Sequence, residues 1–72
     1  MNNQLNATLK ILRNKKGLTQ NQIAKLINVS QRAYSGYETG NREPSIDILI
    51  KLADVYNIPI DVLVGRYILP NA

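Results

Sequence analysis

The sequence predicts a compact all-α domain made of five short helices. Leucine and isoleucine recur at helical spacing along most of the chain, and Ser or Thr stands at three positions where a helix can begin. No stretch of apolar–polar alternation is long enough for a sheet. The 72 residues suffice for one domain, 1–72, with its core over 5–65 and a short C-terminal tail over 66–72.

The first two helices are delimited by their end signals. Leu5, Leu9 and Leu12 share one face of a first helix, which ends in two lysines followed by Gly17. Thr19 is placed to cap the next helix, and Gln22 three residues later completes a capping box. This second helix is expected to stop at Asn28, since Asn accepts a positive φ more readily than most residues.

Three further helices follow the same logic. Ser30 predicts the start of a helix over 31–39, and Gly40 its end. Ser45, after a loop that contains Pro44, caps a fourth helix over 46–56. The run 57–59 interrupts the chain before a last short helix over 60–64.

Positive charge is concentrated in the first part of the chain. Residues 1–42 hold seven basic residues against one acidic residue, Glu38, whereas residues 43–72 hold two basic against four acidic residues. The net charge is +4 and the pI is about 9.7. This asymmetry favours a polyanionic partner on one face, although extra lysines also serve solubility alone.

Several function classes are disfavoured by composition. The chain has no His and no Cys, so no cofactor or metal is expected, and its serines lack the usual activating base. The three carboxylates at positions 47, 54 and 61 look like a solvated face, so we do not expect an enzyme. No apolar stretch is long enough to span a membrane and no signal peptide is visible, which favours a cytoplasmic protein.

The segment 19–39 has the pattern of a DNA-binding helix-turn-helix. Ala24 is a small residue at the position where two helices cross closely, and Val29 follows the turn as an apolar plug. Tyr34 and Tyr37, at helical spacing, are interpreted as core anchors of the second helix; base stacking is the alternative.

These features together resemble the lambda-repressor-like, Cro-type helix-turn-helix family, also called XRE. The resemblance covers residues 5 to 65 in order and spacing, and it is carried by Leu12-Arg13, Lys16-Gly17-Leu18-Thr19-Gln20, Ile23-Ala24, Val29-Ser30-Gln31, Tyr34-Ser35-Gly36-Tyr37-Glu38-Thr39-Gly40, Arg42-Glu43-Pro44-Ser45, Leu49, Leu52-Ala53, Ile58 and Leu63. It implies a transcriptional regulator, expected to be a repressor, that binds double-stranded operator DNA as a homodimer, at least on the DNA. The helix 31–39 would then lie in the major groove.

The resemblance also implies roles for individual residues. Base edges would be read by Gln31, Arg32 and Ser35. Phosphates would be contacted by Gln20, Ser30, Lys16, Asn41 and Arg42. An ion pair of Arg13 with Glu38 would tie the first helix to the recognition helix, and the dimer interface would use Val64, Tyr67 and Ile68.

Other interpretations of these residues stay open at this point. Gln20 also fits as a plain first-turn residue, Lys16 as a partner of the helix dipole, and Asn41 and Arg42 as solvated loop residues. The sequence departs from the family at Asn28, which replaces a common turn glycine, at Pro59, and at Gly36 inside the recognition helix. The alternative function is a protein-interaction module of the same fold, such as an antitoxin or antirepressor, and it predicts an apolar recognition face.

Overall fold

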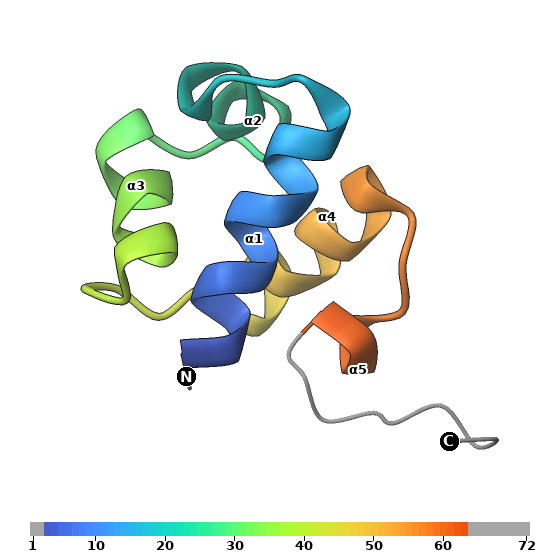
Figure 1. Ribbon diagram of the computed structural model, residues 1–72. Helices are drawn as coiled ribbons and strands as arrows, with labels where there is room; N and C mark the ends of the chain where they lie inside the picture. The colour runs from blue at the N-terminus through green and yellow to red at the C-terminus, as the bar shows by residue number, and fades with distance from the viewer. Residues whose placement is uncertain (1–2, 64–72) are drawn as a thin grey trace, which may run out of the picture.

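The computed structural model describes residues 3–63, which form five helices (Figure 1). They are α1 (Asn3–Lys16), α2 (Gln20–Leu26), α3 (Gln31–Thr39), α4 (Ile46–Tyr56) and α5 (Ile60–Leu63). No strand occurs among the described residues. The all-α class and the helix order predicted from the sequence are therefore confirmed.

The junction of α1 and α2 is formed by local signals. Gly17 has a φ of 71°, in the left-handed region that a residue with a Cβ atom rarely adopts. The Thr19 hydroxyl then accepts a hydrogen bond from the backbone N–H of Gln22 (3.1 Å), and the Gln22 side-chain oxygen accepts one from the backbone N–H of Thr19 (2.8 Å). This reciprocal capping box satisfies two N–H groups that have no partner within the helix.

The turn between α2 and α3 is short and built around Asn28. Its φ is 62°, as the sequence predicts, and Ile27 just before it is the C-cap of α2. The backbone N–H of Val29 donates to the carbonyl of Ala24 (3.0 Å), and the Ser30 hydroxyl accepts from the N–H of Ala33 (3.0 Å). The direction in which α3 leaves the turn is thus fixed by a backbone bond on the α2 side and by a side-chain cap on the α3 side.

The core is apolar and draws on all five helices. Ala24 is fully buried, which gives α2 the small side chain required for close packing against α3. Tyr34 and Tyr37 are buried with their rings edge to face, 6.1 Å between centroids, so both belong to the core. The buried core residues are Leu5, Leu9, Ile23, Ala24, Ile27, Tyr34, Tyr37, Leu49, Leu52, Ala53, Tyr56 and Leu63.

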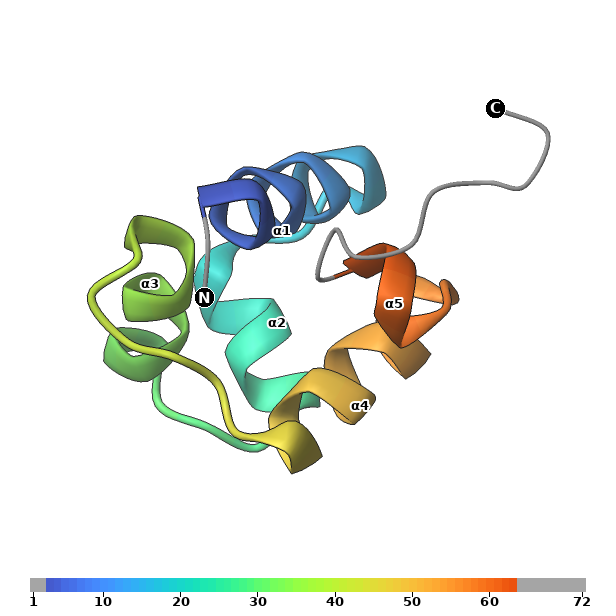
Figure 2. The ribbon, with the colours of Figure 1, turned by 90° about the horizontal axis from the view of Figure 1, so that it is seen from below.

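Helix α4 is bounded by local signals, and α3 and α5 lie on opposite sides of α1. The Ser45 hydroxyl caps α4 by accepting a hydrogen bond from the N–H of Ile48 (3.2 Å), and Asn57 ends this helix with a φ of 56°. In both ribbon views α3 lies on one side of α1 and α5 lies on the opposite side (Figures 1 and 2). The exposed face of α3 therefore points away from α5.

Candidate nucleic-acid interface

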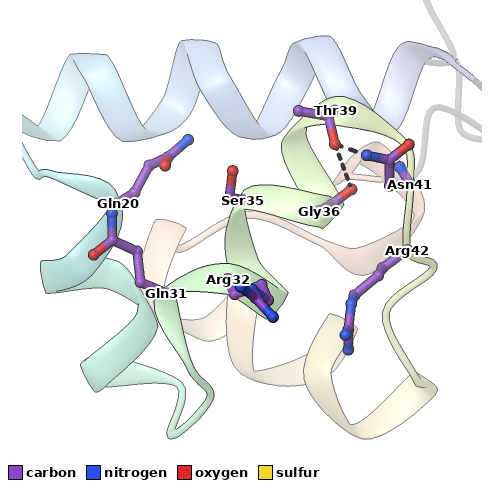
Figure 3. A pocket seen from close by; sticks show the side chains of 8 residues that line it. All are labelled: Gln20, Gln31, Arg32, Ser35, Gly36, Thr39, Asn41 and Arg42. Atoms are coloured by element: carbon purple, nitrogen blue, oxygen red, sulfur yellow. Dashed lines mark hydrogen bonds between the residues drawn. The ribbon is translucent and has the colours of Figure 1, made fainter.

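An open groove of about 560 Å³ runs along the exposed face of α3 (Figure 3). We call it the α3 groove. It takes residues from the start of α2, from α3 and from the loop that follows α3, which are separate in sequence. Its lining residues are Gln20, Gln31, Arg32, Ser35, Gly36, Thr39, Asn41 and Arg42.

The chemistry of the α3 groove is uniform. Its side chains are two guanidinium groups, three amides and two hydroxyls, together with one glycine, and none is a carboxylate. Guanidinium groups only donate hydrogen bonds, whereas amides and hydroxyls both donate and accept. Such a surface fits a ligand that combines negative charge with a mixture of hydrogen-bond donors and acceptors. In DNA the phosphates supply the charge, and the base edges supply the donors and acceptors.

The three residues expected to read bases lie together in this groove. Gln31 and Arg32 occupy the first turn of α3 and are exposed, while Ser35 is half-buried one turn later. The structure also brings Gln20, Asn41 and Arg42 to the same surface. Six of the eight residues expected at DNA thus share one groove.

The other two do not line it. The Ser30 hydroxyl is occupied as the N-cap of α3, where it accepts from the N–H of Ala33. Lys16 is the exposed last residue of α1. A DNA contact by either residue would lie beside the α3 groove.

Gln20 has a structural partner that sequence reasoning missed. Its Nε2 donates to Glu38 Oε1 over 3.0 Å. A carboxylate only accepts hydrogen bonds, so the nitrogen of the amide must face Glu38, which leaves the second N–H and the carbonyl oxygen of Gln20 available. Glu38 thereby orients the Gln20 amide at the edge of the α3 groove.

Glu38 also holds α1 against α3. Arg13 Nε lies 2.6 Å from Glu38 Oε2, and its Nη2 donates to Oε1 over 3.2 Å, so the pair is bidentate. Arg13 Nη1 donates in addition to the carbonyl of Leu18 (2.9 Å). This is the pairing that the resemblance implied for Arg13 and Glu38, and it fixes α3 relative to α1.

The pKa of Glu38 reflects this environment. The Glu38 side chain is only 4 % exposed, and this burial would by itself raise the pKa of its carboxyl group. Hydrogen bonds from Arg13, Tyr34 and Gln20 outweigh burial and bring the pKa below the usual value of a glutamate. Glu38 is therefore a stable anion under the α3 groove at neutral pH.

Two lining residues were not expected at the site. Thr39 donates from its hydroxyl to the carbonyl of Gly36 (3.2 Å) and accepts from the backbone N–H of Asn41 (3.4 Å), which shapes the loop after α3 (Figure 3). Gly36 is buried, although Arg32, Thr39 and Arg42, which line the same groove, are exposed. Thr39 could have been predicted at the site, because it is a polar residue at the end of the predicted helix. No signal in the sequence shows which side chain covers Gly36.

Other site types find no support in the described region. No cluster of three or more His, Cys, Asp or Glu side chains that could hold a metal ion occurs among residues 3–63. Within the same range, no helix has both the length and the apolar character needed to cross a membrane. The residues expected at a dimer interface, Val64, Tyr67 and Ile68, lie outside the described residues.

Comparison with known proteins gives a consistent family. Residues 9–63 match the family model HTH_3, described as helix-turn-helix. The HTH-type transcriptional regulator ImmR of Bacillus subtilis is 39% identical over 62 residues, which are 86% of this chain and 49% of that protein. The cryptic phage CTXphi transcriptional repressor RstR of Vibrio cholerae is 43% identical over 49 residues, which are 68% of this chain and 44% of the repressor.

A solved structure agrees. The crystal structure of a transcriptional regulator from Listeria innocua superposes with a TM-score of 0.83 at 40% identity, and the match covers 90% of this chain and 60% of that one. This chain spans about half the length of curated relatives such as ImmR.

Proposed function

This chain belongs to the helix-turn-helix family, and from that membership we propose that it binds double-stranded operator DNA and represses transcription. The observation that carries the proposal is the α3 groove, whose side chains are guanidinium, amide and hydroxyl groups with no carboxylate. In this arrangement α3 enters the major groove with its first turn deepest. We place this activity in the cytoplasm.

Within this proposal, Gln31 and Arg32 read base edges. Both are exposed in the first turn of α3, and Ser35 lies on the same face one turn later. Gln bonds bidentately to adenine at N6 and N7, and Arg to guanine at O6 and N7. Half-sites should therefore contain an A·T pair and a G·C pair close together.

Phosphate contacts surround this base-reading centre. Gln20 offers the second N–H of an amide that Glu38 already orients. Asn41 lines the α3 groove, whereas Ser30, just before α3, and Lys16, at the end of α1, lie outside its lining. Such contacts set the register of the protein on the duplex without reading sequence.

The test is selection of bound sites from a library of random duplexes, followed by binding measurements on alanine variants. Gln31→Ala or Arg32→Ala should each weaken binding to the selected site by about 1–3 kcal/mol and relax preference at one base pair. Gln20→Ala should weaken all duplexes alike. An Arg32→Ala variant that lost the same affinity on every duplex would show a phosphate contact there and contradict the assignment.

The polar character of the α3 groove also bears on the alternative of a protein-interaction module. That function predicts an apolar recognition face, and the groove is lined by cations, amides and hydroxyls. Binding to nonspecific duplex should weaken steeply as salt is raised, because each phosphate contact by a cation releases counterions. Binding that did not respond to salt would favour a protein partner.

We further propose that two copies bind one operator as a symmetric dimer. Dimeric helix-turn-helix proteins place their recognition helices in successive major grooves, about 34 Å apart. Since α5 lies on the side of α1 opposite α3, a contact between two copies through α5 would leave both α3 grooves open (Figures 1 and 2). The residues expected at the dimer interface, Val64, Tyr67 and Ile68, follow α5 in sequence.

The dimer is tested by sedimentation of the full chain, alone and with the selected operator. We expect a complex of two copies per duplex, and half-sites whose centres are one helical turn apart. Val64→Asp should reduce the stoichiometry to one copy. One copy per operator at saturating wild-type protein would refute the symmetric arrangement.

A further inference from the structure

Gly36 has no side chain on the recognition helix, and the side chain of Arg42 occupies the space that one would take. It lies four residues after Arg32, so the two positions share a helix face. A Cβ atom added at Gly36 would lie only 2.9 Å from Cγ, 3.1 Å from Cδ and 3.2 Å from Cβ of Arg42. The aliphatic part of Arg42 thus lies directly on the helix backbone at Gly36, which explains why this glycine is buried on an otherwise exposed face.

The position of Arg42 is fixed by its own backbone as well. Its N–H donates to the Gly36 carbonyl over 3.2 Å, and the Gly40 N–H donates to the same carbonyl over 2.9 Å. Gly40, with a φ of 88°, reverses the chain at the end of α3 and returns it toward Gly36. The base of the Arg42 side chain is therefore held over α3.

Arg42 and Arg32 both line the α3 groove, and Figure 3 shows the Arg42 side chain reaching back from the loop after α3 toward this helix. In the described part of the chain, no hydrogen bond or ion pair engages the guanidinium group of Arg42. A guanidinium group presented on a helix face without an acceptor is suited to a bidentate contact with an external ligand.

We propose that Arg42 reads a base pair in the major groove, in the place that a side chain at position 36 would otherwise occupy. Gly36 is the positioning residue, because any larger side chain would displace the Arg42 stem from the helix. This inference rests on the proposed DNA binding, and it moves Arg42 from the phosphate contacts expected from the sequence to the base-reading residues. The Arg42 guanidinium would donate to O6 and N7 of a guanine next to the base pairs read by Gln31 and Arg32.

The decisive variant is Arg42→Lys, tested on the wild-type selected site and on all single-base-pair changes of it. Lysine keeps the charge and the aliphatic stem but lacks the planar fork that recognises guanine bidentately. We expect affinity for the selected site to fall about tenfold, with preference relaxed at one base pair only. Lys51→Ala, which removes an exposed cation of α4 outside the groove, is the charge control for the Arg42→Ala variant used below and should leave the preference unchanged.

Gly36→Ala tests the positioning role. A Cβ atom at position 36 displaces the Arg42 stem, but Ala is also a better helix former than Gly. The thermal midpoint of Gly36→Ala should therefore not fall below that of the wild type. We expect Gly36→Ala to relax preference at the same base pair as Arg42→Lys. In an Arg42→Ala background, Gly36→Ala should have no further effect on that base pair, since coupled residues are not additive.

Three results would overturn the inference. The first is that Arg42→Lys binds every duplex as the wild type does, while Arg42→Ala weakens binding to all duplexes equally. Arg42→Ala would then also lower the slope of log affinity against log salt concentration by about one, as expected for a phosphate contact. The effects of Gly36→Ala and Arg42→Ala could add, or they could fall on different base pairs. A wild-type chain that selects no site at all would instead refute the proposed function, and this inference with it.

Discussion

Replacing Glu38 with alanine should lower the free energy of unfolding by about 3 kcal/mol, because it leaves the Arg13 guanidinium without its partner inside the fold. Arg13 is only 13 % exposed, and Glu38 also accepts from Gln20. In a domain of this size, the loss corresponds to a fall of roughly 12–24 °C in the thermal midpoint. Urea unfolding followed by circular dichroism measures the free energy, and a temperature scan followed by the same signal measures the midpoint.

The matched control is Asp54→Ala, which removes an exposed carboxylate from α4. Its effect should stay within about 0.5 kcal/mol, as for other surface positions. Arg13→Ala should destabilise as strongly as Glu38→Ala. A Glu38→Ala variant as stable as Asp54→Ala would show that the ion pair contributes nothing beyond the surrounding packing.

The same pair predicts how stability depends on acid. Since the pKa of Glu38 is lower in the folded than in the unfolded chain, its contribution is fully present above about pH 4.3, the usual pKa of a glutamate. The contribution is lost as the pH falls through the lower, folded-state pKa. The difference in unfolding free energy between wild type and Glu38→Ala should therefore shrink as the pH is lowered from 5 to 2. A difference that stayed constant over this range would assign the cost to packing.

The second large effect is expected at Tyr34, the largest fully buried side chain among the described residues. Tyr34→Ala removes its ring from the contact with Tyr37 and leaves a cavity in the core, at a cost of about 4 kcal/mol. Tyr34→Phe keeps the ring and removes only the hydroxyl, which lies 3.2 Å from the Tyr56 hydroxyl in the core. We expect Tyr34→Phe to cost about 1–2 kcal/mol, because a buried partner loses its hydrogen bond.

Chemical denaturation of the two Tyr34 variants separates ring packing from hydrogen bonding. Alkaline titration gives an independent measure, since burial and the hydrogen bond to Tyr56 raise the pKa of Tyr34 well above its usual value of 10. The stability tied to the neutral hydroxyl is present below pH 10 and is lost as the pH rises toward the folded-state pKa. Tyr34→Phe should weaken this alkaline loss, and an unchanged profile would place the titrating group elsewhere.

The sequence predicts those parts of the fold that depend on neighbouring residues. Capping residues at Thr19, Ser30 and Ser45 identified three helix starts, and Asn28 identified the turn of the helix-turn-helix, because each of these signals acts within about four residues. The tyrosines at positions 34 and 37 were likewise recognised as core from their spacing.

The parts that escaped prediction depend on the path of the chain in space. The bond from Gln20 to Glu38 joins residues 18 apart on different helices, and no periodicity relates them. In the sequence Gly36 is only a departure from the family pattern, whereas in the structure it accommodates the stem of Arg42 after the chain has reversed at Gly40. Side-chain contacts formed across a reversal or between helices require the three-dimensional packing.

The shortness of the helices has a consequence for how binding is measured. With 7 residues in α2 and 9 in α3, neither helix would persist outside the folded chain, since isolated helices below about 12–15 residues are marginal in water. Only the folded fraction of molecules can then bind, and the apparent dissociation constant equals the intrinsic one divided by that fraction. At the thermal midpoint, where half of the molecules are folded, the apparent dissociation constant of a variant with an intact groove would be twice the intrinsic one. Operator DNA would in turn raise the midpoint, because it binds only the folded chain.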